Sequence, residues 1–345
     1  MSRAKTSGNG RATLEEVARA ASVSRATASR VVNGDERVHQ AARVAVEQAI
    51  RELGYVPNRA ARSLVTRRSD SVAVVIPEPP GQLFGDPFFA RMLRGISDGL
   101  AEHEIQLILL MPQARRDEAR VERYLAAGHV DGALLISLHG PDPLPAHLHA
   151  RGLPVVVGGR PTGEGITYVD VDNRRGARSA VEHLLDQGRR NIATIAGPQD
   201  MAPGVDRLAG YRDAMAAGGQ AADDRLVAVS DFTADGGRAA MARLLAAAPH
   251  LDAVFVASDL MAIGALSALQ ASGRRTPADV AVVGFDDSAL ATSTDPALSS
   301  VRQPIEQMGQ EMTRLLLNQI SRPVDAPRRV ILETSLVVRQ SSAPM

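Results

Sequence analysis

The spacing of apolar residues changes near position 70, and this change predicts two structurally different parts of the chain. Before it, apolar residues recur at intervals of three and four, as on amphipathic helices. After it, short apolar runs rich in Val and Ile alternate with amphipathic stretches, the pattern of repeated βα units. We expect, in chain order, a polar disordered tail (residues 1–10), a helical head (11–57), a hinge helix with a linker (58–70) and a two-lobed α/β body (71–345).

The first helix of the head is predicted to begin at Thr13. Thr13 and Glu16 form a T-x-x-E capping box, in which two side chains satisfy backbone N–H groups at the helix start. The apolar face of this helix consists of Leu14, Val17 and Ala18. The small residues that follow, AASV, predict a turn before the next helix.

A second short helix is predicted to begin after the N-cap Ser24 and to end at Asn33 and Gly34. Its outward side chains are Arg25, Thr27, Ser29 and Arg30, and its inward ones are Ala28, Val31 and Val32. Arginines and hydroxyls on the N-terminal half of a helix suit the reading of base edges in the major groove of DNA. An amphipathic surface helix without a DNA role shows the same pattern and is the alternative.

A third helix is expected near Gln40 to Leu53, where it would close a small core with the first two. The side chains expected to face this core are Val44, Ala45, Ile50 and Leu53. Beyond Pro57, Asn58 can cap a short hinge helix over residues 59–65, and a polar linker follows.

The net charge of the chain is zero, but its charges are unevenly distributed. Residues 1–68 hold 13 Lys and Arg against 6 Asp and Glu, a balance of +7. The remaining residues hold 26 against 33, a balance of −7. A basic head on an acidic body favours contact with DNA phosphates by the head alone.

Eight apolar runs of the body predict strands, and amphipathic stretches between them predict helices. The expected strands are Val72–Ile76, Gln106–Leu110, Gly132–Ile136, Val155–Val157, Ile192–Ile195, Leu226–Val229, Ala253–Val256 and Val280–Val283. The expected helices include Phe88–Leu100, Arg116–Ala127, Arg175–Gln187, Arg207–Ala216, Gly236–Ala247 and Met261–Ala271. So many units divide into two doubly wound lobes, and such sheets bind small ligands at the carboxyl ends of their strands.

Two segments of the head resemble the lactose/galactose repressor (LacI/GalR) family of bacterial regulators. VSRATASRVVNG, residues 23–34, is similar to the family's recognition-helix pattern V-S-x-x-T-V-S-R-V-L/I-N, with Ala28 in place of the usual Val. LGYVPNRAARSL, residues 53–64, is similar to the end of the family's third helix and to its hinge helix.

The resemblance continues through the body to about residue 340 in ordered landmarks. These are residues 86–89 (DPFF), 130–132 (VDG), 171–173 (VDN), 188–192 (GRRNI), 207–211 (RLAGY), 258–264 (SDLMAIG), 283–287 (VGFDD) and 301–304 (VRQP). Arg189 replaces a usual His, and Ser258 replaces a usual Asn near the ligand pocket. The Ser258 replacement leaves the identity of the ligand open.

The resemblance implies a homodimer whose helix-turn-helix heads bind a pseudo-palindromic double-stranded DNA operator. It also implies a periplasmic-binding-protein-like core whose lobes exchange the chain three times. Helix pattern and resemblance together assign DNA contact to Thr13, Ser24, Arg25, Ala26, Thr27, Ser29, Arg30, Asn33, Tyr55, Asn58, Arg59, Ala61 and Leu64. For Leu64 the resemblance implies a wedge inserted into the minor groove, and the alternative is ordinary burial against the linker or a lobe.

Arg207, Asp286 and Phe232 are candidate ligand contacts in the body. Arginine donates to hydroxyls or a carboxylate, aspartate accepts from hydroxyls or ring N–H groups, and phenylalanine stacks on a sugar or base face. Further candidates are Asp172, Phe88, Phe89 and Ser258. The alternative is that Arg207 and Asp286 form structural ion pairs, and the family positions favour ligand contact.

Other function classes lack their sequence signatures. The G-x-S-x-G match at residues 95–99 lies in a helical pattern, whereas a nucleophile elbow needs a strand, a turn and a helix. No phosphate-binding glycine motif, cysteine or metal-ligand spacing of histidines is present, so we expect no enzyme, cofactor or metal. No signal peptide or membrane span is evident, so we expect a cytoplasmic protein without a membrane partner, and a secreted solute-binding protein is the lesser alternative.

The combined prediction is a homodimeric repressor of sugar-utilisation genes. Its operator affinity would change when a small sugar-like effector binds between the two lobes. A neutral, hydroxyl-rich sugar fits Arg207, Asp286 and Phe232 best, and a purine or nucleoside is the alternative effector. The sequence does not indicate whether the effector induces or co-represses.

Overall fold

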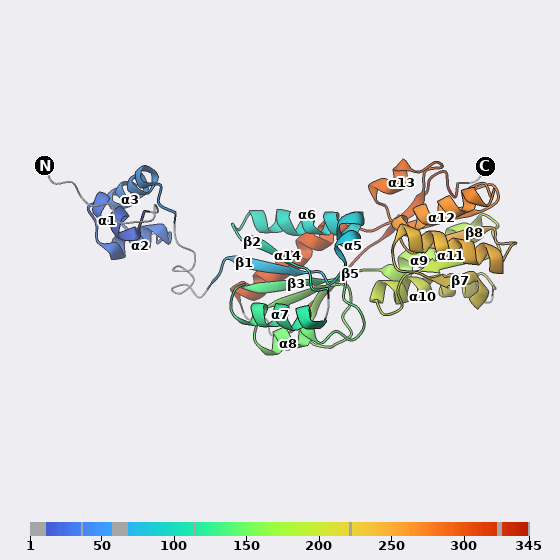
Figure 1. The fold of residues 1–345 in the computed structure, drawn as a ribbon, viewed down its shortest axis with the longest axis horizontal. Coiled ribbons are helices and arrows are strands. Elements are labelled where there is room, and N and C mark those ends of the chain that lie inside the picture. The colour runs from blue at the N-terminus through green and yellow to red at the C-terminus, as the bar shows by residue number, and fades with distance from the viewer. Residues whose placement is uncertain are drawn as a thin grey trace. The chain divides into compact units, whose positions relative to one another are not determined.

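The computed structural model describes residues 12–35, 37–56, 68–113, 115–220, 223–322 and 326–343. The chain divides into two compact units, Met1–Ser69 with the head and Asp70–Met345 with the body (Figure 1). The expected tail over residues 1–10 and the expected hinge helix over residues 59–65 lie outside the described residues.

Three helices form the head: α1 (Leu14–Ala20), α2 (Arg25–Val32) and α3 (Gln40–Leu53). The capping box is confirmed, because Glu16 accepts from the backbone N–H of Thr13 at 2.8 Å and the Thr13 hydroxyl accepts from the N–H of Glu16 at 3.3 Å. Ser24 caps α2 by accepting from the N–H of Thr27 at 3.1 Å. The predicted helix-turn-helix is therefore confirmed, with both helix starts set by local capping.

The core of the head differs from the prediction on one helix. Its buried residues are Val17, Ala18, Ala28, Val31, Val46 and Ala49. Val44 and Leu53, expected inside, are 49% and 41% exposed. The expectation for these two residues was wrong. Val44 is two positions from the inward-facing Val46 and therefore points to nearly the opposite side of the helix, whereas Leu53 is the last residue of α3.

The body contains two six-stranded sheets, one in each lobe. The N-terminal lobe holds β1 (Ser71–Val75), β2 (Gln106–Leu110), β3 (Gly132–Ile136), β4 (Val155–Gly158), β5 (Thr167–Val171) and β11 (Arg329–Leu332), in the order β11-β5-β4-β3-β1-β2. The C-terminal lobe holds β6 (Ile192–Ala196), β7 (Val227–Val229), β8 (Ala253–Val256), β9 (Ala281–Asp286), β10 (Ser299–Arg302) and β12 (Ser335–Val337), in the order β12-β10-β9-β8-β6-β7. The described neighbours pair parallel except β10 with β12, so the predicted doubly wound α/β fold is confirmed.

Helices cover both faces of each sheet (Figure 1). On the N-terminal sheet, α6 (Pro87–Ala101) and α14 (Ile305–Ser321) pack on one face, and α7 (Arg115–Ala126) and α8 (Leu144–Ala150) cover the other. On the C-terminal sheet, α11 (Ala234–Ala247) and α12 (Asp259–Ala271) cover one face, and α9 (Asn173–Asp186) and α10 (Ala202–Ala217) the other. The shorter elements are α5 (Pro80–Gly85), η1 (Asp224–Leu226) and α13 (Ala289–Ser293).

The chain passes between the lobes three times: after β5, between β10 and α14, and between β11 and β12. These crossings confirm the chain exchange that the resemblance implied. In each lobe, the loops that follow the carboxyl ends of the parallel strands line the space between the lobes. The candidate effector site therefore lies where open α/β sheets place their ligands.

Four strands were missed by the apolar pattern: β5, β10, β11 and β12. The sequence of β5 is TYVDV, with Asp170 in its middle, and that of β10 is SSVR. The strands β11 and β12 are short edge strands with exposed or half-buried residues. Polar residues interrupt the apolar runs of β5 and β10, and β11 and β12 are only four and three residues long, so none of the four stands out from loops by hydrophobicity.

Two glycines bring α6 and α14 into close contact. A Cβ atom on Gly95 would overlap the carbonyl oxygen of Glu306, and one on Gly309 would lie 2.6 Å from the carbonyl oxygen of Met92. The G-x-S-x-G match thus lies within α6, with Ser97 exposed on the helix. Its first glycine is explained by helix packing, and the strand and turn of a nucleophile elbow do not precede the serine.

The variant Gly95→Ala should lower the free energy of unfolding by about 1–3 kcal/mol, because the added methyl group forces α6 away from α14. Urea unfolding, followed by circular dichroism, measures this change. The control is Gly81→Ala in α5, where the new Cβ meets nothing within 4 Å. Equal stability of the two variants would show that the helix contact tolerates a larger separation.

Candidate functional site

Five of the thirteen residues predicted to contact DNA lie on α2. Arg25, Ala26 and Arg30 are exposed, and Thr27 and Ser29 are half-buried. The Arg25 side chain is 71% exposed, and its Nε lies 2.7 Å from Oε1 of Glu15 on α1. Exposed pairs of this kind contribute little stability, so Arg25 can exchange Glu15 for a DNA partner at low cost.

The remaining predicted DNA residues are placed around this helix. The Thr13 and Ser24 hydroxyls are occupied as helix caps, and Asn33 ends α2 with its Nδ2 donating to Ser29 at 3.5 Å. Half-buried Tyr55 packs against the core of the head. Asn58, Arg59, Ala61 and Leu64 lie outside the described residues.

An inner pocket of about 80 Å³ lies between the lobes of the body. It is lined by Gln82, Asp86, Phe88, Phe89 and Ser137 of the N-terminal lobe, and by Met201, Pro203, Arg207, Phe232, Ser258, Asp286 and Gln303. Six of the seven predicted ligand residues therefore line one pocket, and the exception is Asp172.

Arg207 is 5% exposed and held by partners from several elements. Its Nε donates to Oδ1 of Asn173 at 2.8 Å, and its Nη1 donates to the carbonyl oxygen of Ala257 at 2.6 Å. The Nη1 also lies 3.7 Å from Oδ1 of Asp286, and the guanidinium carbon lies 3.7 Å from the ring centroid of Phe285. These contacts fix the guanidinium before any ligand arrives.

Asp286 forms the carboxyl end of β9 and is 7% exposed. Its Oδ1 accepts from Nε2 of Gln303 at 2.6 Å, and its carbonyl oxygen accepts from Nη1 of Arg91 at 3.2 Å. Its φ of 112° lies in a region that side chains rarely adopt, and such strain is typical of ligand sites. Arg207 and Asp286 both line the inner pocket, with Arg207 inside α10, which begins five residues earlier at Ala202.

Burial shifts the protonation of the acidic groups around Arg207. Loss of water raises the pKa of Asp286 well above its usual range, and Arg207 opposes that shift. Burial also raises the pKa of Asp170 and of Asp259 to about 6, and raises that of Asp86. These four carboxyl groups share one buried guanidinium, so the surroundings of the inner pocket have an excess of acidic groups.

The aromatic residues form two walls of the inner pocket. Phe232 has a φ of 63°, and its ring lies against Gly197, where a Cβ would overlap it. The guanidinium of Arg207 is 5.9 Å from the centroid of that ring. Phe88 and Phe89 meet edge to face with centroids 5.3 Å apart. Phe89 is also a core residue, and both rings line the pocket.

Asp172 does not line the inner pocket, and its contact with a ligand stays a prediction. It is the N-cap of α9, where its Oδ1 accepts from the backbone N–H of Arg175 at 3.0 Å. The next residue, Asn173, is the one that reaches Arg207, and its Nδ2 donates to Asp170 at 3.0 Å. The landmark VDN pointed to this turn, but adjacent residues at a helix start point in different directions.

Other residues of the site were missed by sequence reasoning. Asp86 lies in the family segment DPFF and Gln303 in the segment VRQP, so the resemblance could have indicated both. Gln82 and Ser137 lie in no such segment, and nothing in the sequence indicated them. Ser258 has two structural roles. Its hydroxyl caps α12 by accepting from the N–H of Met261 at 3.2 Å, and the residue also lines the inner pocket.

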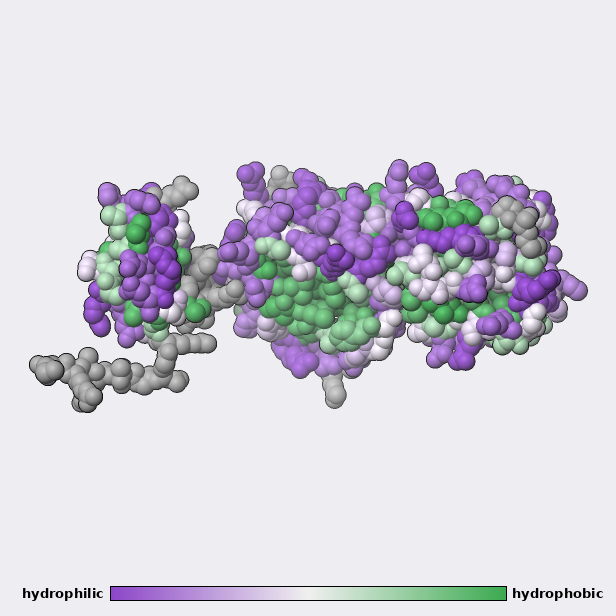
Figure 2. Space-filling view, turned by 90° about the horizontal axis from the view of Figure 1, so that it is seen from above, coloured by the Kyte–Doolittle hydropathy of each residue, from purple (hydrophilic) through white to green (hydrophobic). Residues whose placement is uncertain are grey.

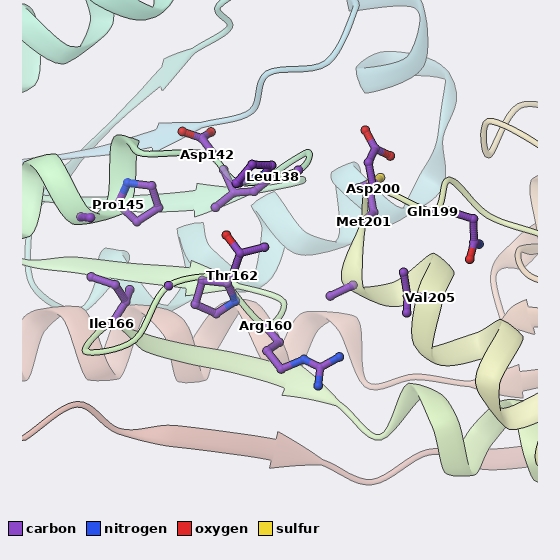
Figure 3. A pocket seen from close by; sticks show the side chains of 16 residues that line it. Leu138, Asp142, Pro145, Arg160, Thr162, Ile166, Gln199, Asp200, Met201 and Val205 are labelled. Atoms are coloured by element: carbon purple, nitrogen blue, oxygen red, sulfur yellow. The ribbon is translucent and has the colours of Figure 1, made fainter.

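A larger space, which we call the outer cleft, adjoins the inner pocket. Its volume is about 670 Å³. Residues within 138–146 and 160–166 of the N-terminal lobe line one side, and residues within 199–205 of the C-terminal lobe line the other. Figure 3 shows these two groups facing each other, with the Arg160 side chain directed toward the helix that carries Val205.

Two ion pairs beside the outer cleft join the lobes. Arg160 donates to both carboxylate oxygens of Asp206, at 2.6 and 2.8 Å. His139 lies 2.9 Å from Asp200 across the cleft and 3.1 Å from buried Glu78 within its own lobe. Hydrogen bonding to Glu78, together with Asp200, raises the pKa of His139 to about 9. The imidazolium thus stabilises this arrangement of the lobes.

Some site classes are absent from the part of the chain that the structure describes. There, no helix is both long and apolar enough to cross a membrane. In the same ranges, no group of three or more acidic or histidine side chains is arranged to hold a metal ion.

A helix-turn-helix head combined with a two-lobed body and a buried polar cleft defines an effector-controlled DNA-binding protein. Residues 13–58 match the model of the lacI family of bacterial regulatory proteins, and residues 181–342 match a periplasmic binding protein-like domain. The regulator CelR of Thermobifida fusca is 53% identical over 334 residues, which cover 96% of this chain and 98% of CelR. The ribose operon repressor of Halalkalibacterium halodurans is 36% identical, covering 96% and 97% of the two chains.

Solved structures agree with these sequence matches. A complex of the transcriptional regulator CelR with cellobiose matches with a TM-score of 0.77 and 51% identity, over 96% of this chain and 100% of that one. The Lac repressor dimer bound to operator and the anti-inducer ONPF matches with a TM-score of 0.86 and 27% identity, over 97% and 100%. The chain belongs to the LacI family of bacterial regulatory proteins. It is a sequence-specific DNA-binding transcriptional regulator.

The stability of the body should depend on pH through His139. Because its pKa in the folded body lies above the usual value of about 6.5, its stabilising effect is complete below that pH and is lost as the pH rises through about 9. Melting temperatures measured from pH 6 to 9.5 should fall less steeply for His139→Asn than for the unchanged protein. The control is His103→Asn, an exposed position, and an identical slope for all three proteins contradicts the prediction.

Proposed function

We propose that this regulator is a homodimeric repressor of sugar-utilisation genes, and that a neutral sugar in the inner pocket changes its affinity for the operator. The observation that supports this site most directly is the buried set of Arg207, Asn173 and Asp286. This set offers fixed donors and acceptors to hydroxyl groups, which donate and accept in turn. The cellobiose complex of CelR and the name of the ribose operon repressor are consistent with a sugar effector here.

The charges around the inner pocket favour a neutral effector over an anionic one. Asp86, Asp170, Asp259 and Asp286 all act on the one buried guanidinium of Arg207. A phosphate or carboxylate would add negative charge to a site that holds little water, where like charges repel strongly. A sugar hydroxyl adds no charge and can donate to these oxygens. A purine, which could stack on the Phe232 ring, is the second candidate.

On the DNA side, we place α2 in the major groove with Arg25 at base edges and Thr27, Ser29 and Arg30 beside it. In the hinge, Asn58, Arg59 and Ala61 would follow the minor groove, and Leu64 would insert between base pairs as a wedge. The basic charge of the head supports this assignment, since phosphate contacts dominate affinity for DNA. The regulator would act in the cytoplasm, where bacterial DNA lies.

Homodimer formation is supported by an apolar surface on the N-terminal lobe. Strand β2 is an edge strand, and its Leu107, Leu109 and Leu110 are only half-buried. Figure 2 shows a face on which apolar residues gather over this lobe. An edge strand with half-exposed apolar residues tends to associate with another protein chain unless something covers it. We propose that a second copy of this chain covers it. Two heads on one dimer then match two operator half-sites.

Coupling between sugar and DNA requires that the effector bind one arrangement of the lobes better than another. The inner pocket takes Asp86 and Ser137 from one lobe and Arg207 and Asp286 from the other. A ligand that contacts both lobes stabilises the lobe arrangement in which residues of both lobes can contact it at the same time. Because the chain enters the body through β1 of the N-terminal lobe, a change in lobe arrangement can reach the hinge.

Arg25→Ala should weaken binding to the operator by about 1–3 kcal/mol, because a bidentate contact to guanine is lost. Binding to random DNA should change less. Fluorescence anisotropy at one fixed salt concentration measures both, with an operator selected from a random DNA pool. Arg51→Ala on α3 is the matched control. Equal losses on operator and random DNA would reduce Arg25 to a phosphate contact.

Asp286→Asn should weaken sugar binding roughly 10- to 100-fold, since an acceptor oxygen is replaced by an amide group that only donates, and a buried hydroxyl left without its partner costs about 1–3 kcal/mol. Arg207→Ala should abolish the response of operator binding to sugar. Calorimetric titration with cellobiose, ribose and adenosine measures binding, and anisotropy measures the response. The control is Asp235→Asn, whose side chain is 88% exposed. If both pocket variants respond like the unchanged protein, the pocket assignment is wrong, and a response to adenosine alone favours the purine.

A further inference from the structure

Glu15 of α1 and Arg25 of α2 form an ion pair on the surface of the head. Oε1 of Glu15 lies 2.7 Å from Nε of Arg25, and the two side chains are 55% and 71% exposed. Glu15 is the second residue of α1, and Arg25 is the first residue of α2. A pair this exposed adds little to folding stability. Its place at the start of the proposed recognition helix connects it with DNA binding instead.

The carboxylate of Glu15 is an unusual group to find beside a helix proposed to enter DNA. The head is basic, with a balance of +7 over residues 1–68, and phosphates repel an acid. The capping box at the start of α1 uses Thr13 and Glu16, so it does not require Glu15. If Arg25 released Glu15 on DNA, the carboxylate would be left unpaired beside the phosphates. Keeping the pair in the complex avoids that repulsion.

The contact with Glu15 occupies one side of the Arg25 guanidinium and leaves another side available. Nε faces the carboxylate, whereas Nη1 and Nη2 form the far edge of the planar group. Guanine presents N7 and O6 in the major groove, and an arginine edge with parallel N–H groups can donate to both. Arg25 can therefore keep its contact with Glu15 while its Nη edge binds a guanine.

Arg25 has the side chain at the N-terminal end of α2 that is best suited to reach a base. The next residue, Ala26, has no polar side-chain atom, and the hydroxyl of Thr27 lies 2.9 Å from that of the cap Ser24. A long arginine side chain has many rotamers, and fixing it on a base costs entropy. A partner that restricts these rotamers before DNA binds reduces this cost.

Tyr55 lies near the pair and ties it to the packed part of the head. Its side chain packs against the core of the head, and the charges of both Glu15 and Arg25 act on its phenol group. Burial raises the pKa of Tyr55, Glu15 raises it further, and Arg25 opposes the shift. The pair thus lies beside a packed surface, which limits how far its two side chains can move.

We propose that Glu15 is a positioning residue for base recognition. It holds Nε of Arg25 so that the Nη edge meets a guanine, and it thereby strengthens the preference for guanine at one base pair of each operator half-site. Glu15 itself contacts no base. This role rests on the proposed contact of Arg25 with base edges, and it adds the residue of α1 that orients that contact.

The test measures base preference as well as affinity, for the full chain. Fluorescence anisotropy at one fixed salt concentration compares an operator selected from a random DNA pool with operators in which one base pair of each half-site is changed. Arg25→Ala identifies the base pair that Arg25 reads, because the preference there is lost. The unchanged protein should prefer guanine at that base pair by roughly tenfold or more.

Glu15→Ala should reduce this guanine preference by about three- to fivefold, the range that an exposed ion pair can supply. Binding to random DNA should stay equal or tighten, because an acid that faces phosphates is removed. In the Arg25→Ala background, Glu15→Ala should change no base preference further, since the residue it orients is gone. A merely structural role at the start of α1 would weaken binding to every sequence alike and leave the preference unchanged.

The matched control is Glu47→Ala on α3, which removes the same side chain from another exposed position of the head. It should keep the full guanine preference, and circular dichroism should show the same helix content for both variants. An unchanged preference in Glu15→Ala overturns the proposal. A further change in the double variant also overturns it, because Glu15 would then contact a base itself. If Arg25→Ala loses no base preference, the proposed role of Arg25 fails, and the role of Glu15 fails with it.

Discussion

The buried guanidinium of Arg207 is the interaction on which the effector cleft depends. A charge removed from water is costly unless its partners are in place, and here they come from α9, from the end of β8 and from the end of β9. The C-terminal lobe must therefore bring these element ends together to within hydrogen-bonding distance. The same requirement preorganises the pocket, because its donors are aimed before a ligand binds.

Local signals in the sequence predicted the parts of the fold that local interactions determine. The capping residues Thr13 and Ser24 identified the starts of α1 and α2, and continuous apolar runs identified β2, β3 and β8 with their observed bounds. The inward face of α3 was misjudged at Val44, because that face depends on where α1 and α2 lie. For the same reason the polar strands β5 and β10, which are held by their neighbours, were missed.

The candidate site was predictable to a similar extent. Arg207, Asp286 and Phe232 were found from their positions in a family pattern, which carries tertiary information that periodicity does not. Asn173 was missed in favour of its neighbour Asp172, since only the packed structure shows which of two adjacent polar side chains turns inward. Buried Asp170 and Asp259 were also missed, because the general rule for carboxylates is exposure.

The exchange of chain between the lobes has a consequence for synthesis on the ribosome. The N-terminal lobe begins with β1 but is completed only when α14 and β11 are synthesised. Arg91, for example, pairs with Glu306, which lies 215 residues later in the chain. Contacts so distant in sequence form slowly and leave apolar surface uncovered in the meantime. The core residues of the head lie between Leu14 and Tyr55 and are therefore made early. A nascent chain therefore carries the whole core of its DNA-binding head well before either lobe of the body can close its sheet.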